Sequence, residues 1–262
     1  MVWRKEFLKA FLERDLPQLG FRIPAQSLFR FWSILAHYHG NVWNAAEPAR
    51  ALDISQPTVR QYLDLLTSLF MVRTLPPWHE NLLKRQVKAP KVYIRDSGLL
   101  HQLLGIASET QLLHHPKLGS SWEGYAIEEA LKAIEPDEAY FWATHSGAEL
   151  DLLVLKNGKR FGIEVKRQDA PRVTPSMRIA LADLRLEHLT VLYPGSEVLR
   201  PRSENSRRPD RRARESRSER AHPARSAQVR VEVTLTSRHP QNLNFSHCAP
   251  HLAHVAPPPV LL

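Results

Sequence analysis

Residues 149–167 read ELDLLVLKNGKRFGIEVKR, and the fold of the second half of the chain follows from this stretch. Two short apolar runs flank the pair Asn157 and Gly158. Asn-Gly is the strongest short-range signal for a two-residue type I′ turn, because both central residues of that turn take a positive φ. The stretch therefore predicts a β-hairpin in which Lys156 pairs with Lys159.

This register sets acidic side chains against each other across the two strands. Asp151 falls opposite Glu164, and Glu149 falls opposite Lys166. Side chains alternate along a strand, so all four are expected on one face of the hairpin. Opposed Cβ atoms lie roughly 4.5–5.5 Å apart, where like charges are unfavourable unless something offsets them. A divalent cation between Asp151 and Glu164 would offset them.

Length and composition indicate a soluble globular protein. The chain has 262 residues, 43% of them hydrophobic, which is enough for two modest domains. No apolar run approaches the roughly 18–20 residues of a membrane span, and no signal-peptide core is visible. We therefore expect a cytoplasmic protein without a membrane partner. The single cysteine, Cys248, excludes an internal disulfide and a multi-cysteine metal site.

Most of the net charge of +9 lies near the end of the chain. Residues 199–262 hold 12 arginines, no lysine and 5 acids, whereas the preceding residues are nearly neutral. This tail is rich in arginine, serine and proline, so we expect it to be disordered. It is either a basic arm that binds phosphates or sequence read out of frame, and the absence of lysine favours the second interpretation.

The first half of the chain begins with two predicted helices. Residues 3–16 carry apolar side chains at helical spacing, and residues 28–39 form a second apolar-faced helix that stops at Gly40. His37 and His39 lie two positions apart, so they do not share a helix face and are assigned no metal.

Residues 45–70 predict a helix-turn-helix. Ser55 or Gln56 caps the second helix, and Pro57 occupies its first turn, where the missing N–H costs nothing. The residues left at the exposed N-terminal end, where a recognition helix contacts base edges, are Thr58, Arg60 and Gln61. A single arginine on this helix argues against sequence-specific DNA reading, because phosphate contacts normally dominate affinity.

Residues 71–96 continue as strand, irregular segment and strand, an order that suits the wing of a winged helix. The irregular segment carries three bases suited to nonspecific contact with DNA: Lys84, Arg85 and Lys88. Winged helices also dock onto proteins, so a DNA partner and a protein partner both stay open.

A helix after Gly119 carries one informative acid. Its apolar face is formed by Ala126, Ile127, Ala130 and Ile134. Glu123 falls in the middle of that face, whereas Glu128 and Glu129 point away from it. A carboxylate on a buried face is costly unless it meets a cation, a metal or a donor, so Glu123 is a candidate site residue.

The remaining elements complete the order helix, three strands, helix, strand, with a strand at 138–143 before the hairpin. A helix at 174–184 and a strand at 188–195 follow it. Glu123 on the helix, Asp151 on the second strand and the run EVK at 164–166 on the third resemble the PD-(D/E)XK nuclease core. Restriction endonucleases and archaeal Holliday-junction resolvases share that core.

This resemblance implies a Mg²⁺-dependent phosphodiesterase. The expected metal ligands are the carboxylates of Asp151 and Glu164 and the backbone carbonyl of Val165, which are the oxygen ligands that Mg²⁺ takes. Lys166 would orient the attacking water or stabilise charge. Glu123 would complete the metal shell through water. The alternative is an inherited fold in which these acids only form structural ion pairs.

A broader resemblance covers roughly residues 3–198. The runs ERDLPQL, ISQPTVRQYLDLL, PKVYIRDSGLL, GSSWEGYAIEEAL and TPSMRIALADL, together with the hairpin, resemble the C-terminal half of a prokaryotic family of AAA-type ATP-binding proteins. In that family a P-loop ATPase precedes a winged helix and a C-terminal domain of unknown function with a nuclease-like core. No GxxxxGK[ST] motif occurs here, so the chain looks like a truncated member without an ATP site or ATPase activity.

The expected fold is therefore α/β, an N-terminal winged helix-turn-helix followed by a restriction-endonuclease-like α-βββ-α-β domain. The expected parts are an N-terminal helix left from a lost ATPase module (1–25), the winged helix (26–95), a linker (96–118), the nuclease-like domain (119–198) and the tail (199–262). The expected function is a nucleic-acid-associated, Mg²⁺-dependent nuclease-like remnant. Its alternative is a noncatalytic DNA- or protein-binding regulatory module. The oligomeric state is left open.

Overall fold

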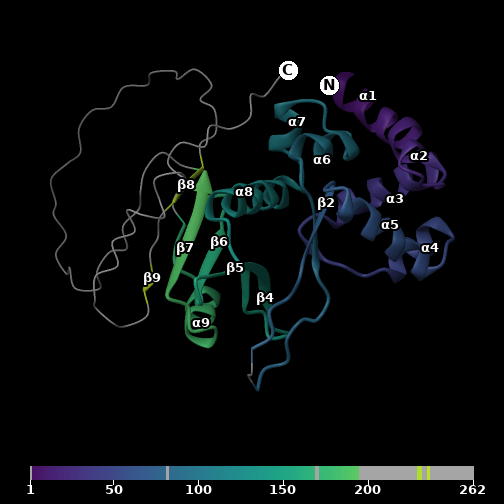
Figure 1. Ribbon diagram of the computed structural model, residues 1–262. Coiled ribbons are helices and arrows are strands. Elements are labelled where there is room, and N and C mark those ends of the chain that lie inside the picture. Colours follow the sequence, from purple (N-terminus) through teal and green to yellow (C-terminus); the bar gives the residue numbers. More distant parts are fainter. Residues whose placement is uncertain (1, 81–82, 169–170, 195–228, 232–234, 237–262) are drawn as a thin grey trace, which may run out of the picture.

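The computed structural model describes residues 2–80, 83–168, 171–194, 229–231 and 235–236. Figure 1 shows a group of helices at one side and a β-sheet at the other, with helix α8 (Leu118–Ile134) running between them. Within these residues no helix is both long and apolar enough to cross a membrane.

The chain begins with a long helical segment. It comprises α1 (Val2–Ala10), a π-helical turn (Phe11–Asp15) and α2 (Leu16–Gln18), and α3 (Ala25–Tyr38) follows. Both segments bury apolar residues at helical spacing in one core, among them Leu8, Phe11, Leu12, Leu28, Phe31, Trp32 and Leu35. The two helices predicted at the start of the chain are confirmed.

The predicted pair of short helices is also present, as α4 (Ala46–Leu52) and α5 (Gln56–Ser68). The side chain of Ser55 accepts a hydrogen bond from the backbone N–H of Thr58 at 3.2 Å, so Ser55 is the N-cap of α5. In Figure 1 both helices lie at the right of the molecule, on the side opposite to strands β6 and β7.

A small antiparallel sheet accompanies these helices, with β3 (Lys91–Ile94) between β1 (Asn41–Val42) and β2 (Val72–Leu75). The connection between β2 and β3 does not stand free as a wing. It lies against the first strand of the second sheet, with bridges from Pro77 to Phe141 and from Gln86 to Thr144.

The segment 96–118, expected as a linker after one short helix, holds two helices. They are α6 (Ser97–Leu103), which Asp96 caps by accepting from a backbone N–H, and α7 (Glu109–Leu113). The long helix α8 follows.

The second sheet is built from β4 (Glu138–Ala143), β5 (Glu149–Lys156), β6 (Lys159–Val165) and β7 (His188–Pro194), in that order. Only the β6–β7 pair among these four strands is parallel, because helix α9 (Pro175–Asp183) crosses over between them. Helix α8 covers one face and α9 the other (Figure 1). The predicted order of helix, three strands, helix and strand is observed.

Five residues of the tail that was expected to be disordered pair with the far edge of this sheet. Strands β8 (Val229–Val231) and β9 (Leu235–Thr236) pair antiparallel with β7. The sequence VRVEVTLT at 229–236 alternates apolar and polar residues at strand period, a local signal that the overall composition of the tail hides. The rest of 199–262, and with it Cys248, lies outside the described residues.

The hairpin has the predicted register from the turn to Leu152, whereas the predicted pairs Asp151–Glu164 and Glu149–Lys166 lie beyond the paired residues. Lys156 pairs with Lys159, and the pairing continues to Leu152 opposite Ile163. Asn157 and Gly158 have φ values of 53° and 72°, as a type I′ turn requires.

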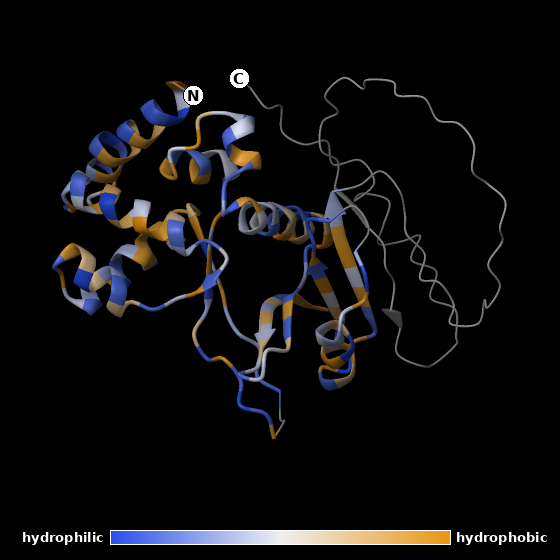
Figure 2. Ribbon diagram, turned by 180° about the vertical axis from the view of Figure 1, so that it is seen from behind, coloured by the Kyte–Doolittle hydropathy of each residue, from blue (hydrophilic) through white to orange (hydrophobic). Residues whose placement is uncertain are grey.

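The two halves of the molecule share a core. Leu75 of β2 and Tyr93 of β3 are buried in the cluster formed by α8 and the inner face of the second sheet. Figure 2 shows apolar residues concentrated on the strands of this sheet and along the inner sides of the helices. The small sheet therefore packs against the same helix that carries Glu123.

Candidate functional site

Charged side chains from four elements meet at the end of the hairpin remote from the Asn-Gly turn. They come from β3, α8, β5 and the end of β6, and we call them the acid cluster. Its members are Lys91, Glu123, Glu149, Asp151, Glu164 and Lys166, and charge interactions of Asp151 with Glu164 and Lys166 join the two sets of ion pairs. The structure thus brings together all four predicted catalytic residues, namely Glu123, Asp151, Glu164 and Lys166.

A β-bulge directs Asp151 into this cluster. In the β4–β5 ladder Tyr140 pairs with Leu153, but Trp142 pairs with Leu150, so one residue of β4 faces both Asp151 and Leu152. Strict alternation from Leu153 would send Asp151 toward α9, where Leu153 itself is buried. The extra residue instead brings its carboxylate toward β3, within reach of Lys91.

Asp151 is held from the other hairpin strand. Its Oδ2 accepts a hydrogen bond from the backbone N–H of Val165 at 2.8 Å, and the residue is only 8% exposed. Burial raises the pKa of Asp151 well above its usual value, and the charges of Glu164 and Glu123 add to that rise. A neighbouring cation would favour the ionised form.

Glu164 has one satisfied and one unsatisfied oxygen. Its Oε1 accepts a hydrogen bond from Nζ of Lys166 at 2.6 Å. Its Oε2 is buried and has no hydrogen-bond partner among the described residues. Burial raises the pKa of this carboxyl too, because Lys166 and, to a smaller extent, the backbone N–H of Asp151 offset only part of the lost hydration. A buried carboxylate oxygen without a partner is uncommon and points to a missing cation or donor.

Lys91 was not predicted as a site residue, yet its ammonium contacts three of the four acids. Nζ lies 3.4 Å from Oε1 of Glu123 and 4.0 Å from Oδ1 of Asp151, and it forms an ion pair with Glu149. Burial alone would lower the pKa of Lys91, but the three carboxylates outweigh burial and raise it. The expected Glu149–Lys166 contact is therefore wrong, since Glu149 pairs with Lys91 and Lys166 with Glu164.

Tyr93 is the second residue that sequence reasoning missed. Its hydroxyl donates a hydrogen bond to Oε1 of Glu123 at 2.6 Å. Burial, followed by the charge of Glu123, raises the pKa of Tyr93, so the hydroxyl keeps its proton. A signal was available in the sequence, because Lys91 and Tyr93 alternate with Val92 and Ile94 and so predict one polar face on this strand.

Glu128 was expected to point away from the core, and that expectation is wrong. The residue is buried and pairs with two arginines of the small sheet, with Nη2 of Arg73 and Nε of Arg95 each 3.0 Å from its Oε2. A helix that is covered on two sides has two buried faces. The expectation allowed α8 only one.

The two histidines near the end of α3 are placed differently. Nδ1 of His39 accepts a hydrogen bond from the backbone N–H of Ile94 at 3.0 Å, and Nε2 donates to the carbonyl of Ser120 at 3.1 Å. Both ring nitrogens are thus used in joining α3, β3 and α8. His37 is exposed at the end of α3.

Two buried carboxylates beside a backbone carbonyl form a donor set that suits a hard cation such as Mg²⁺. In the described part of the chain, no three His, Cys, Asp or Glu side chains are placed together as ligands of one metal ion. An ion held by Asp151 and Glu164 would therefore complete its shell from the carbonyl of Val165 and from water. Mg²⁺ usually keeps several water ligands, so this donor set fits it.

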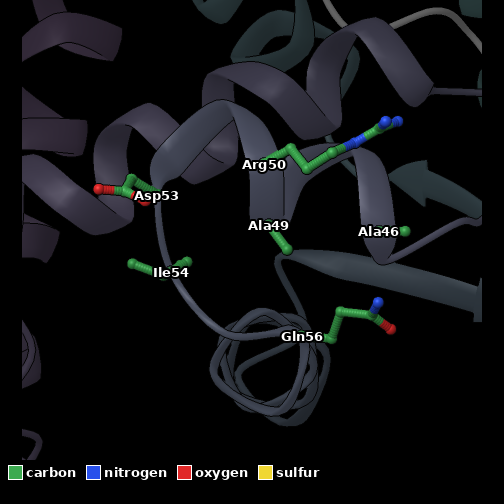
Figure 3. Close-up of a pocket in the computed structure, with 6 residues that line it drawn as sticks. All are labelled: Ala46, Ala49, Arg50, Asp53, Ile54 and Gln56. Atoms are coloured by element: carbon green, nitrogen blue, oxygen red, sulfur yellow. The ribbon is translucent and has the colours of Figure 1, made fainter.

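The predicted nucleic-acid contacts on α5 differ in exposure. Arg60 and Gln61 are exposed, whereas Thr58 is half-buried and its hydroxyl lies 2.8 Å from that of Ser55. Beside them, a shallow pocket of about 530 Å³ lies over the turn between α4 and α5 (Figure 3). It is lined by Ala46, Ala49, Arg50, Asp53, Ile54 and Gln56, and it contains no member of the acid cluster.

The bases of the β2–β3 connection are also unequal. Nζ of Lys84 lies 2.6 Å from Oδ2 of Asp183 at the end of α9, so this lysine is engaged within the protein. Arg85 and Lys88 are exposed, and a role for them in nucleic-acid binding stays a prediction.

Comparison with known proteins gives matches over most of the chain. Residues 1–110 match the family model of a domain of unknown function, DUF8612, and residues 118–207 match that of a domain of unknown function, DUF4143. The second match agrees with the C-terminal domain of unknown function that the sequence resemblance implied.

Two curated relatives have no described function. They are the uncharacterized proteins Mb2031c of Mycobacterium bovis and Rv2008c of Mycobacterium tuberculosis, each 51% identical over 194 residues. The matched region is 74% of this chain and 44% of either relative, so the chain spans less than half of their length.

A search of solved structures found the crystal structure of the transcriptional regulator PA3341. It is 21% identical, covers 50% of this chain and 85% of its own, and has a TM-score of 0.23, which does not establish a common fold. The chain is thus similar to longer mycobacterial proteins, and its C-terminal part matches a domain of unknown function, DUF4143.

Proposed function

We propose that this chain is a nucleic-acid-associated module whose acid cluster binds one divalent metal ion and hydrolyses phosphodiester bonds. The observation that carries the proposal is the buried Oε2 of Glu164, which has no hydrogen-bond partner among the described residues, beside the buried carboxylate of Asp151. Lys166 compensates only one oxygen of Glu164, and a buried charge that is incompletely compensated is destabilising, so a cation at this position would account for both groups.

The charge of the cluster supports one ion. Four carboxylates and two ammonium groups leave a formal charge of −2. One divalent ion neutralises that charge. The ligands would be Asp151, Glu164 and the carbonyl of Val165, as the PD-(D/E)XK resemblance also implies.

The chemistry follows from the groups that surround that position. When bound, Mg²⁺ would lower the pKa of a coordinated water and place a positive charge near the phosphate. Burial would lower the pKa of Lys166, but the charge of Glu164 outweighs it and raises the pKa. Lys166 therefore stays protonated and serves to hold a phosphate oxygen or orient the water, rather than to accept a proton. Glu123, fixed by Tyr93 and Lys91, would act through water.

Association with nucleic acid is supported by the helix-turn-helix. Its second helix presents Arg60 and Gln61 at an exposed N-terminal end, and Arg50 of the adjacent helix is exposed beside the shallow pocket (Figure 3). We also propose that the part of the longer relatives outside the match contains an AAA-type ATPase module.

The second candidate function is a noncatalytic regulatory module that binds DNA or a protein. Lys91 favours it, because its ammonium already compensates three of the carboxylates. In that case the acid cluster is an ion-pair network that joins the small sheet to the hairpin.

A cleavage assay separates the two candidates. The protein is incubated with single-stranded, duplex and branched DNA in Mg²⁺ or Mn²⁺, beside the variants Asp151→Ala and Lys166→Ala. Lys159→Ala is the matched control, because it changes an exposed lysine at the other end of β6. The nuclease proposal predicts cleavage by the parent and the control and none by the two site variants. Cleavage by no protein, or equal cleavage by all, contradicts it.

A further inference from the structure

We infer that Lys91 is a built-in cation that takes the place of a second divalent ion, so that the cluster accepts a single metal ion. This inference rests on the proposed metal site at Asp151 and Glu164 and specifies how many metal ions the cluster binds. In the proposed chemistry Lys91 only helps to fix Glu123, and it comes from β3 of the small sheet.

The contacts of the ammonium group are those of a coordinated cation. Nζ of Lys91 is surrounded by oxygens of Glu123, Glu149 and Asp151, and the residue is 5% exposed. The ring of Phe141 lies 5.5 Å from Nζ and closes one further side. Carboxylate oxygens of three side chains, from α8 and β5, around one point are also what a divalent ion requires.

The acids fall into two groups that share Asp151. Lys91 serves Glu123, Glu149 and Oδ1 of Asp151, whereas Oε2 of Glu164 is left without a partner among the described residues. A metal ion would therefore bind on the Glu164 side. The other side is filled by the lysine.

Lys91 cannot withdraw easily, because its backbone is fixed. It lies in the central strand of the small sheet, paired with Val42 on one side and Leu75 on the other. Two residues along, Tyr93 holds Glu123 in place. The small sheet therefore supplies both the cation and a hydrogen-bond donor to the acids of the second sheet.

Removal of the ammonium charge should open the second site. Lys91→Met keeps the length and apolar stem of the side chain but changes the formal charge of the cluster to −3. Lys88→Met is the matched control, since it changes an exposed lysine in the same segment of the chain. Mn²⁺ is the probe, and isothermal titration calorimetry together with electron paramagnetic resonance counts the bound ions.

The parent and Lys88→Met should each bind one Mn²⁺. Lys91→Met should bind two, with the first ion bound roughly tenfold tighter or more, because the variant removes the repulsion between the ammonium group beside Asp151 and a divalent ion on the same carboxylate. Unchanged stoichiometry and affinity in Lys91→Met would overturn the inference and leave the one-ion site standing.

Two other outcomes distinguish the inference from the proposed function. Binding of one ion by Lys91→Met and none by the parent supports the lysine as the resident cation and contradicts the proposed metal site. Binding of no ion by either protein overturns both.

A double variant tests the charge argument if Lys91→Met folds poorly. Lys91→Met with Glu149→Gln restores the parent charge of −2, and the side chain of Glu149 is 45% exposed and so tolerant of change. This variant should fold and bind one Mn²⁺. Binding of two ions by the double variant would show that charge does not set the number and would overturn the inference.

Discussion

The backbone N–H of Val165 donates a hydrogen bond to Oδ2 of Asp151 at 2.8 Å, beyond the last backbone pair of the hairpin. That last pair is Leu152 with Ile163. Beyond it the two strands are joined by this hydrogen bond to a side chain, in place of backbone–backbone hydrogen bonds. The candidate metal site lies where the backbone pairing of β5 and β6 ends. The carboxylate of Asp151 therefore has a structural contact as well as its proposed ligand role.

Asp151→Asn should separate these two roles. The amide oxygen can still accept from the N–H of Val165, while the buried negative charge is gone. Because the folded-state pKa of Asp151 is raised, its stabilising contribution is present below the unfolded pKa and is lost as pH rises through the folded one.

At neutral pH we therefore expect Asp151→Asn to unfold at the parent temperature or above, yet to lose Mn²⁺ binding. Asp151→Ala, which removes the acceptor, should unfold at a lower temperature. Thermal unfolding followed by circular dichroism compares the three proteins. Equal losses of stability in both variants would show that the charge, not the hydrogen bond, holds the strands together.

Gly124 is needed where α8 crosses His39. A Cβ at Gly124 would lie 2.4 Å from Nε2 of the His39 ring and 3.3 Å from the ring of Tyr93. Gly124→Ala should lower the free energy of unfolding by about 1–3 kcal/mol, because overpacking outweighs the better helix propensity of alanine.

Gly119 of the same helix is the matched control, since nothing lies within 4 Å of its added Cβ. Gly119→Ala should raise the free energy of unfolding by up to about 1 kcal/mol. Urea unfolding measures both. Similar effects of the two substitutions would contradict the close packing of α8 on His39.

The hairpin and its acids can be predicted from sequence because their signals are local. The turn at Asn157 and Gly158 sets the register, and the period of the two strands gives the faces as far as Leu152 and Ile163. The bulge at Asp151 cannot be predicted in this way, because it is set by the partner strand β4 and not by the hairpin.

Lys91 and Glu128 could not be placed for a different reason. Lys91 lies 32 positions before Glu123, and no local pattern states how the small sheet packs on α8. Glu128 is buried by that same packing. Contacts between elements far apart in the chain decide both positions.

The stability of the protein should fall in mild acid because of His39. Burial lowers the pKa of this histidine to about 4, and Nδ1 accepts a hydrogen bond only when unprotonated. A folded pKa below the unfolded value means that the unfolded state binds the proton first. The stabilising contribution is therefore present above about pH 6.5 and is lost as pH falls toward 4, by about 2–4 kcal/mol.

Urea unfolding between pH 4 and 7 measures this loss. His39→Asn places an amide oxygen near the position of Nδ1 and does not titrate, so it should flatten the pH dependence even if it is less stable overall. His101, whose pKa burial also lowers to about 4, keeps its own contribution in that variant. A pH slope equal to that of the parent would contradict the assignment to His39.

DNA retention should depend on α5 more than on the β2–β3 connection. Arg60 is exposed at the end of the helix-turn-helix that would meet DNA, whereas Lys84 already pairs with Asp183. Each lost phosphate contact reduces the salt dependence of binding by about one unit of slope. We expect Arg60→Ala to weaken binding and flatten that slope, and Lys84→Ala to leave both near the parent value.

Fluorescence anisotropy with duplex DNA over a series of salt concentrations tests this. A larger effect of Lys84→Ala would mean that the connection leaves the second sheet when DNA binds.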